Sequence, residues 1–421
     1  VALLMTNKTP VGTYRGPGRY EADFFRERLI DMAARDLRLD PVEFRRRNLI
    51  AESEMPYALA TVVEPEIATE TDSGDYGATL ARCLTEFGWT AKAKLQGSLV
   101  DGRYHGLAVG CYLEGGGTGP RENARLVLEA DGMVSVYVGS SSVGQGIETV
   151  FAQIAADALE MPMDRIKTVF HGSTDHVAEG FGSFSSRSVV MGGSAIVAAA
   201  ASLREKIKAA AAEALGCGAS EIVIDQGEAV APGTARRSIA LAALASAALA
   251  ADGTFASSKR TYSYGAHAAH VAVDPKTGHI ELVDYVAVED VGRIINPLTL
   301  HGQCVGAIVQ GLGGALLEHF IYDADAQLLT GSFADYLLPS ASDFPRIRAV
   351  ALEQKPSPHN PLGAKGAGEG GIIPVGGVVA NAVAAALVSL GVEPHELPLS
   401  PARVWALIHG TPPALTSQSA R

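Results

Sequence analysis

The spacing of apolar residues predicts two helices near the start of the chain. Over residues 20–37, apolar side chains recur every three or four positions with Arg and Asp between them, as on an amphipathic helix. Asp40, followed by Pro, marks the start of a short helix over 41–48, because Asp caps a helix and Pro favours its first turn. Residues 51–95 are polar and rich in turns, which predicts a linking segment with one helix near 76–88.

Beyond residue 104, short β-rich runs alternate with Ala-rich helical segments. A turn signal at 274–278 separates two of the runs and predicts a hairpin. Hairpins mixed with helices, instead of strict alternation of strand and helix, predict an α+β fold. The expected strands lie at 126–128, 134–138, 270–273 and 280–288, and the expected helices at 147–160, 193–215, 239–250, 303–318 and 379–390.

One uncharged stretch, residues 371–390, is long enough to cross a membrane. It contains Pro374 and Asn381, and the apolar residues of its second half follow helical spacing. We therefore expect a loop that leads into a buried helix, and no membrane span.

Composition and charge exclude several classes of protein. The 421 residues, 47% of them hydrophobic, are enough for two or three domains with buried cores. A net charge of −12 argues against nucleic acid as a partner, because phosphate binding requires a basic surface. The basic run Arg45 to Arg47 is expected to be a solvated helix end. The four cysteines are widely spaced, which is typical of reduced thiols in a cytoplasmic protein: Cys83, Cys111, Cys217 and Cys304.

Glycine is in excess, with 46 residues, or about 11%, where about 7% is usual. A first glycine-rich cluster, 139–146, precedes a predicted helix, and the free N–H groups of a helix start can hold an anionic group. Its spacing resembles a phosphate-binding loop, but Gln145 stands where that loop has Lys, and no hydroxyl follows for Mg²⁺. A nucleoside triphosphatase is therefore not expected, and a plain strand-to-helix turn stays open.

Three further clusters carry candidate chemistry. Residues 180–188 combine hydroxyls, backbone donors and one guanidinium, which suits either a polar cofactor or a serine-rich cap. Residues 310–314 place glycines inside a predicted helix at about 1 kcal/mol each relative to Ala, which implies a close approach to the backbone. Residues 363–371 surround Glu369, which is either a sheltered general base or part of a flexible surface loop.

Two histidines, His267 and His270, offer a different signal. They lie three residues apart on a predicted strand, so their side chains point to opposite faces. We do not expect them to bind one metal ion.

Seven motifs follow one another along the chain, and it is their order that is specific. They lie at 14–19, 143–146 with Thr149, 186–188, 289–297, 310–313, 335–339 and 366–369. In this order they resemble the molybdenum-binding large subunit of the xanthine oxidase family of molybdenum hydroxylases, a family that includes aldehyde oxidase and aerobic carbon monoxide dehydrogenase.

The resemblance implies a domain organisation. Residues 1–95 resemble the C-terminal end of a first cofactor-binding lobe plus a linker, and residues 96–421 resemble the complete second molybdenum cofactor-binding domain. The implied fold is α+β, of mixed sheets and helices in an elongated two-lobe arrangement whose first lobe is incomplete. A companion chain with the N-terminal half of the molybdenum subunit is then expected.

The resemblance also implies a function, that of a cytoplasmic, hetero-oligomeric oxidoreductase. It would insert water-derived oxygen into an aldehyde or N-heteroaromatic substrate, with Glu369 as the general base that takes a proton from the attacking oxygen. Molybdopterin, with the cytosine dinucleotide as one form, would hold molybdenum without a protein ligand, and iron–sulfur clusters and FAD would lie on partner chains. The positions that match cofactor-binding residues are Arg15, Gly16, Gly144, Gln145, Gly146, Ser186, Arg187, Ser188, Gln310, Gly366 and Gly368.

Two departures from the family pattern narrow the range of expected substrates. Gly16 stands where the carbon monoxide dehydrogenase branch has a copper-binding Cys, so carbon monoxide oxidation is not expected. Pro17 stands where xanthine enzymes of the mammalian type have a Phe that stacks on a planar substrate. Stacking must therefore come from elsewhere, or the substrate is not flat.

Two alternatives of other classes stay open. One is a non-catalytic scaffold or assembly subunit with the same fold and no metal, although the retained Glu369 speaks against it. The other is a glycine-loop protein that binds nucleotide and would bind ATP tightly as an isolated chain.

Overall fold

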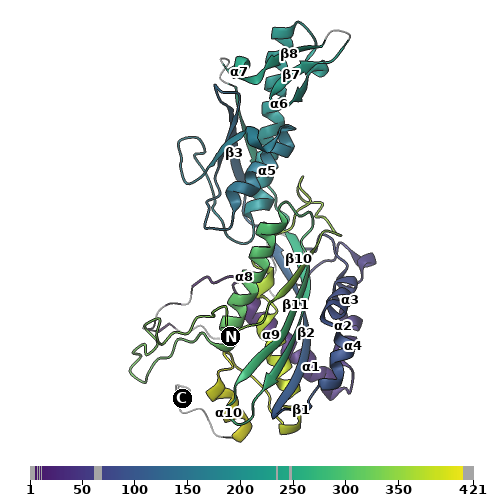
Figure 1. Cartoon of the computed structure of the whole chain (residues 1–421), viewed down its shortest axis with the longest axis vertical. Helices are drawn as coiled ribbons and strands as arrows, with labels where there is room; N and C mark the ends of the chain where they lie inside the picture. Colours follow the sequence, from purple (N-terminus) through teal and green to yellow (C-terminus); the bar gives the residue numbers. More distant parts are fainter. Residues whose placement is uncertain are drawn as a thin grey trace.

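The computed structural model describes residues 5–6, 8, 10, 12–60, 69–233, 236–245 and 249–410. The molecule is elongated and consists of two parts stacked along its long axis (Figure 1). The lower part in that view is built on a five-stranded sheet, and the upper part on a four-stranded and a three-stranded sheet. Hairpins and helices are mixed in both parts, so the predicted α+β fold is confirmed.

The sheet of the lower part has the strand order β1-β2-β10-β11-β12. Its long central strands pair antiparallel, and the last strand joins the edge parallel to β11. The predicted turn at 274–278 connects β10 to β11. The strands are β1 (Leu99–Val100), β2 (Arg103–Gly116), β10 (Thr261–Val273), β11 (Ile280–Asp290) and β12 (Arg348–Leu352).

Helices cover both faces of this sheet (Figure 1). Two hydrophobic cores result, and β10 is buried at every position because both of its faces are covered. One face carries α1 (Arg19–Asp36), α8 (Pro297–Leu316), α9 (Val375–Ala386) and α10 (Pro401–His409), and the other carries α2 (Pro41–Asn48) and α3 (Tyr76–Phe87), followed by the single turn α4 (Trp89–Lys92).

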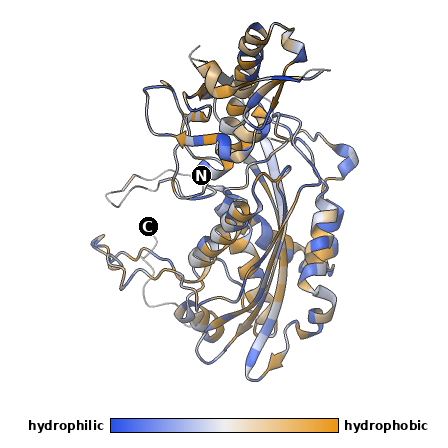
Figure 2. Cartoon of the chain, turned by 45° about the horizontal axis from the view of Figure 1, so that its top comes forward, coloured by the Kyte–Doolittle hydropathy of each residue, from blue (hydrophilic) through white to orange (hydrophobic). Residues whose placement is uncertain are grey.

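The uncharged stretch near the end of the chain forms the buried helix α9, as expected, although it begins at Val375 and not at 379. The helix crosses β2 so closely that Gly106 has no room for a side chain: an added Cβ would lie 2.0 Å from the carbonyl oxygen of Ala382. Hydrophilic and hydrophobic residues are interleaved along the helices (Figure 2). In the described part of the chain, no helix is long and apolar enough to cross a membrane.

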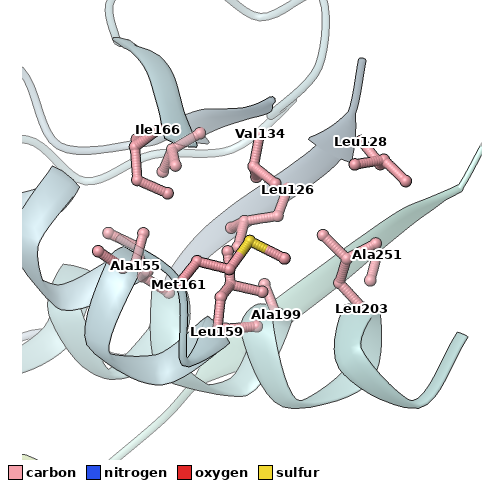
Figure 3. Packing of buried hydrophobic residues seen from close by; sticks show 14 of the residues in the cluster. Leu126, Leu128, Val134, Ala155, Leu159, Met161, Ile166, Ala199, Leu203 and Ala251 are labelled. Atoms are coloured by element: carbon pink, nitrogen blue, oxygen red, sulfur yellow. The ribbon is translucent and has the colours of Figure 1, made fainter. Parts of the chain in front are cut away.

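The upper part packs two helices against its four-stranded sheet, which has the order β5-β4-β3-β9. Figure 3 shows Leu126 and Val134 of the sheet meeting Leu159 and Leu203 of the helices. The strands are β3 (Glu122–Leu128), β4 (Val134–Val138), β5 (Ile166–Phe170) and β9 (Ala250–Phe255), the helices are α5 (Ile147–Leu159) and α6 (Ser194–Leu215), and the small sheet consists of β6 (Val223–Asp225), β7 (Glu228–Ala231) and β8 (Arg237–Ala240).

The helix predicted over 239–250 is wrong. The described residues of this range form the end of β8, the single turn α7 (Leu241–Leu244) and the start of β9, whereas 246–248 lie outside the described residues. The Ala-rich composition favours a helix locally, but β9 pairs with β3 over six residue pairs, and tertiary pairing overrides propensity.

The basic run at the end of α2 is only partly solvated. Arg46 and Arg47 are exposed, as expected, but the side chain of Arg45 is 2% exposed. It lies 2.5 Å from the Glu27 carboxylate and 2.6 Å from that of Asp31, because α2 packs against α1. The expectation was therefore wrong for Arg45, which is a buried structural charge.

Candidate functional site

A cavity of about 880 Å³ lies where the two parts of the molecule meet. The upper part contributes the start of α5 and the serine-rich loop, and the lower part contributes the start of α8 and the loop before Gly370. Three of the four glycine-rich clusters therefore come together. The walls are formed mainly by residues from 13–19, 143–150, 183–189, 291–303 and 364–369.

Glu369 lies on the wall of this cavity, at the start of the short 3₁₀-helix η7 (Gly370–Ile372). The Ser186 hydroxyl donates to its Oε2 at 3.0 Å, and the backbone N–H of Gly16 donates to its Oε1 at 3.2 Å. The guanidinium of Arg19 lies 4.0 Å from Oε2. Two segments that are distant in the sequence, one with Gly16 and Arg19 and one with Ser186, thus hold one carboxylate, whose side chain is 13% exposed.

Arg15 connects the N-terminal segment to two parts of the site. Its Nε donates to the carbonyl oxygen of Gly368 at 2.6 Å, and its NH1 donates to Oε1 of Gln310 at 3.3 Å. Its NH2 donates to the backbone and side-chain oxygens of Gln303 at 3.2 and 3.0 Å. Gln310 is therefore reached through Arg15, whereas Gln303 lines the cavity directly.

The glycines of the site serve two purposes. Gly144 has a positive φ of 94°, and an added Cβ would meet no atom within 4 Å, so its backbone borders open space. Gly366 instead packs against Ser186, where a Cβ would lie 2.7 Å from the serine Cβ. Gly311 and Gly313 in α8 make room for Val375 and Glu318. The close approach to the backbone that was expected for the cluster 310–314 is therefore made by side chains of the protein itself.

Gln145 ties the first glycine loop to the serine-rich loop. Its Oε1 accepts from the backbone N–H of Val143 at 2.6 Å, and its Nε2 lies 3.4 Å from both the carbonyl of Ser141 and the hydroxyl of Ser183. The hydroxyl of Ser188 donates to the same Ser183 hydroxyl at 3.0 Å. Gly146 then caps α5 in the left-handed conformation, with φ 78°.

The guanidinium of Arg187 is fully buried although its residue lines the cavity. Its Nε donates to the carbonyl of Thr118 at 2.8 Å, its NH2 to that of Arg121 at 2.6 Å, and its NH1 to Glu122 Oε2 at 2.5 Å. Each nitrogen is thus engaged by the protein, and the side chain holds the loop before β3 against the serine-rich loop. The sequence offered no signal for Glu122 as its counter-ion.

Sequence reasoning also missed Glu114, Arg19 and Lys365. Glu114 is fully buried on β2 and accepts from NH1 of Arg19 at 2.6 Å. Burial, together with the nearby Glu369 charge, raises the pKa of Glu114 to about 8, although Arg19 acts in the opposite direction. The signal was present, because a lone carboxylate in an otherwise apolar strand needs a partner.

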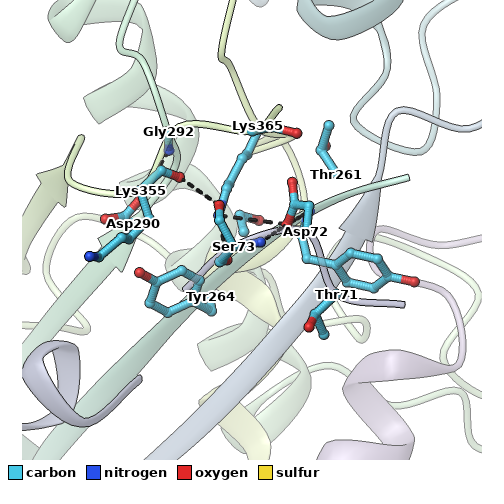
Figure 4. A network of polar contacts seen from close by, with 12 residues as sticks. Thr71, Asp72, Ser73, Thr261, Tyr264, Asp290, Gly292, Lys355 and Lys365 are labelled. Atoms are coloured by element: carbon cyan, nitrogen blue, oxygen red, sulfur yellow. Dashed lines mark hydrogen bonds and ion pairs between the residues drawn. The ribbon is translucent and has the colours of Figure 1, made fainter. Parts of the chain in front are cut away.

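Lys365 connects the glycine-rich loop 363–371 to the segment before α3 (Figure 4). Its Nζ donates to the carbonyl of Ser73 at 2.8 Å and lies 3.7 Å from Asp72. The Ser73 hydroxyl in turn donates to carbonyls of Lys355 and Pro356 at 3.1 and 3.0 Å. The segment before α3 thereby fixes the loop that carries Glu369.

The two histidines of β10 point to opposite faces, as expected. His267 contacts the Tyr285 hydroxyl at 2.9 Å and Glu289 at 3.2 Å, whereas His270 contacts His105 at 2.9 Å. Within the described ranges, no group of three or more His, Cys, Asp or Glu residues could hold a metal ion.

The chemistry of the cavity suits a large polar ligand. Serine hydroxyls and the backbone of Gly144 border it, and the start of α5 brings free N–H groups that favour an anionic group. Glu369 adds one anchored carboxylate, and Phe184 adds an exposed aromatic ring. The arrangement can hold a phosphate-bearing organic group and present a base to a second, smaller molecule.

Comparison with known proteins agrees with this geometry. A family model described as a molybdopterin cofactor-binding domain matches residues 82–345, and a second model of the same description matches 1–49. The gamma subunit of the 6-hydroxypseudooxynicotine dehydrogenase complex of Paenarthrobacter nicotinovorans is 39% identical over 97% of this chain and 52% of its own length. The chain thus spans about half the length of the curated relatives it matches.

Solved structures give the same result. Quinoline 2-oxidoreductase from Pseudomonas putida 86 is 35% identical, with a TM-score of 0.87 over 96% of this chain and 54% of that one. Reconstituted CO dehydrogenase from Oligotropha carboxidovorans is 26% identical, with a TM-score of 0.84 over 93% and 52% of the two chains.

Proposed function

Because this chain belongs to the molybdopterin cofactor-binding domains of the xanthine oxidase family, we propose that it is the catalytic half of a molybdenum hydroxylase. Residues 1–95 would complete a first cofactor-binding lobe, and 96–421 would form the second. The observation that carries the proposal is the Glu369 carboxylate, held on the cavity wall by Ser186 and Gly16.

The cavity fits the expected cofactor in its chemistry. A bound molybdenum–pterin group supplies a two-electron oxidation, and the protein supplies donors and a backbone cleared of side chains. In this proposal the pterin holds the metal, so no side chain of this chain has to coordinate it. The residues proposed to hold the cofactor, directly or by shaping its loops, are Arg15, Gly16, Gly144, Gln145, Gly146, Ser186, Arg187, Ser188, Gln310, Gly366 and Gly368.

Glu369 acts in this proposal as the general base. The hydroxyl of Ser186 and the N–H of Gly16 each donate to a different carboxylate oxygen, so the carboxylate is held in one orientation on the cavity wall. The ionised carboxylate can then accept a proton from the oxygen that attacks the substrate. Since its side chain is only 13% exposed, few waters compete for that proton.

We propose an N-heteroaromatic substrate in preference to an aldehyde. Relatives of this chain are named for nicotine and quinoline, both of which contain such a ring. Phe184 lines the cavity and is 52% exposed, so it offers the aromatic surface that Pro17 does not. Gly16 in place of a copper-binding Cys speaks against carbon monoxide.

The full enzyme would then be a cytoplasmic hetero-oligomer. The N-terminal half of the molybdenum subunit would complete the site, since this chain spans about half the length of its curated relatives. Iron–sulfur clusters and FAD on partner chains would take the electrons. The cytosine dinucleotide is the proposed form of the pterin.

The variant Glu369→Gln tests the base. We expect the purified complex to keep its molybdenum and pterin while kcat falls by about 10²- to 10⁴-fold, because the amide cannot take up a proton. Turnover with a screened set of aldehydes and N-heterocycles and an artificial electron acceptor measures this, beside metal analysis.

Glu281→Gln is the matched control, because Glu281 lies exposed on β11, away from the cavity. Near-normal turnover of Glu369→Gln would contradict the assigned base. Absence of stoichiometric molybdenum and pterin from the wild-type complex would contradict the enzyme itself and favour the scaffold alternative.

A further inference from the structure

Glu114 is a carboxylic acid that the proposed reaction leaves without a role. It lies near the end of β2, opposite Ser263 of β10, and none of its side chain is exposed. Its Oε1 accepts from the guanidinium of Arg19, but no donor among the residues that the structure describes reaches its Oε2. A buried carboxylate oxygen without a donor is costly, unless it carries a proton and acts as the donor itself.

The second carboxylate of the site is the natural acceptor. Arg19 NH1 lies 2.6 Å from Glu114 and 4.0 Å from Glu369, so one guanidinium serves two carboxyl groups. Burial and the nearby charge of Glu369 both raise the pKa of Glu114. Two ionised carboxylates so close to each other repel in a largely dehydrated place, although Arg19 beside Glu114 and Arg15 beside Glu369 act in the opposite direction, and a shared proton removes the repulsion.

The groups that face Glu114 support this assignment. Arg19 comes from α1 and Glu369 from the loop before η7, while Tyr112 on the same strand adds a buried hydroxyl. Ser263, across the sheet, donates its hydroxyl to the Gly366 carbonyl at 2.6 Å, so it offers no proton to Glu114. Glu369 is the other carboxylate among these groups, and a carboxylate is a stronger acceptor for a proton on Glu114 than a neutral hydroxyl.

We propose that Glu114 and Glu369 form a carboxyl pair that shares one proton, in which Glu114 is the protonated, positioning member and donates a hydrogen bond to the catalytic carboxylate. The inference rests on the proposed role of Glu369. In each turnover Glu369 accepts a proton from the attacking oxygen and becomes neutral, and that proton must leave before the next cycle. Only O–H bonds form and break, and the proton on Glu114 stays in place.

A pH dependence follows. The pKa of Glu114, about 8, marks where the pair loses its shared proton. Above this pH the donor is gone and two carboxylates repel each other, so kcat/KM of the wild-type complex falls as the pH rises through about 8. Glu114→Gln can still donate to Glu369 and accept from Arg19 but cannot ionise, and we expect it to lose this alkaline fall.

Glu114→Leu removes the donor at every pH. Since a hydrogen bond to a charged group is strong, we expect kcat/KM to fall by about tenfold or more across the whole range. A merely structural Glu114 would instead make the Gln and Leu variants alike in their pH profiles. An alkaline fall that persists unchanged in Glu114→Gln overturns the proposal.

A measurement on the resting holoenzyme tests the proton without turnover. Infrared difference spectra between pH 7 and pH 9 should show loss of a protonated carboxyl band in the wild type and in the Glu281→Gln control. The band should be missing from Glu114→Gln, and in Glu369→Gln it should remain at a shifted frequency, because the acceptor has become an amide. A band that survives in Glu114→Gln overturns the carboxyl pair.

The two proposals fail separately. Normal turnover of Glu369→Gln would remove the base, while the infrared band would still report whether Glu114 carries the proton. Both proposals are supported if the band disappears between pH 7 and pH 9 in the wild type, is missing from Glu114→Gln, and Glu369→Gln is inactive.

Discussion

Arg187 and Glu122 form an ion pair in which neither side chain is exposed. Their 2.5 Å contact lies between the loop before β3 and the serine-rich loop, at the edge of the cavity. A charge buried in this way is stable only while its partner is present. The pair therefore maintains the cavity wall and makes it sensitive to single substitutions.

Arg187→Met should expose this dependence. Removing the cation leaves Glu122 buried and unpaired, and we expect the free energy of unfolding to fall by about 3–5 kcal/mol. Denaturant unfolding of the purified complex measures this. Arg121→Met is the matched control, because its pair with Glu179 is about half exposed and solvent-screened, so its loss should change the stability little. Equal effects of the two substitutions would contradict the prediction.

For single residues, the sequence indicated which side chains belong to the candidate site better than it indicated which groups they contact. It predicted Glu369 beside a glycine-rich loop, and the structure places that carboxylate on a cavity. It could not predict which ions pair with Glu114 and Glu122, because Arg19 and Arg187 lie more than 60 positions from them. Such pairs depend on how distant strands and loops meet, and local patterns carry no record of that.

The packing of α9 on β2 illustrates how whole elements depend on small residues. Gly106 lies where the helix backbone crosses the strand, and an added Cβ would meet Ala382 and Ala386 backbone atoms at 2.0–2.3 Å. Backbone atoms cannot move aside as the end of a long side chain can. The helix and the strand therefore approach each other at a distance that only glycine permits.

Gly106→Ala should separate these two elements. We expect the free energy of unfolding to fall by about 1–3 kcal/mol, because an extra methyl group in a packed core forces backbone shifts. Gly77→Ala serves as the comparison: it lies exposed in the first turn of α3, and its Cβ would meet only Asp75 Oδ1 at 3.8 Å. That change should stabilise the chain slightly, since Ala favours a helix. A Gly106 variant as stable as the wild type would argue against the close crossing.

Amphipathic helices were predictable, whereas the two long central strands were predicted only in part or not at all. The amphipathic helices α1, α2 and α3 form nearly as predicted. The strands β2 and β10 are covered on both faces and are rich in Gly and Ala, so no alternation marks their full length. The helix predicted for the Ala-rich run at 239–250 was wrong for a similar reason, since a run of Ala does not indicate against which element a segment packs.

Among the described residues, Glu114 and His270 are buried titratable groups whose effects on the stability of the molecule have opposite signs. The pKa of Glu114 is about 8 in the folded chain, against about 4.3 when unfolded. Burial lowers the pKa of His270 to about 4, against about 6.5 when unfolded. Between about pH 4.3 and 8, Glu114 binds a proton only in the folded state, whereas between about 4 and 6.5 His270 binds one only in the unfolded state.

We therefore expect a particular shape for the pH dependence of stability. The Glu114 contribution to the free energy of unfolding falls as the pH rises from about 4.3 to 8, and the His270 contribution rises from about 4 to 6.5. The two oppose each other below pH 6.5, and only the fall remains between about 6.5 and 8. Thermal unfolding of the complex at several pH values measures this.

Two variants separate the contributions of Glu114 and His270 to the pH dependence of stability. Glu114→Gln should abolish the fall between about pH 6.5 and 8, and His270→Gln should extend that fall to lower pH, each relative to the wild type. Curves that stay parallel to the wild type in both variants would show that neither group titrates differently in the folded chain.

The contact of Arg15 with Gly368 has a further consequence, for the order of events in folding. It joins residues 353 positions apart, and Gly16 and Glu369 span the same separation. Closing so long a loop costs conformational entropy. The core of the lower part already requires the same closure, because α1 packs on α9 and Arg28 donates to Asn381 across 353 positions. The N-terminal segment and the loop of Glu369 therefore reach their places together with this core, and a substitution that separates α1 from α9 would also open the cavity wall.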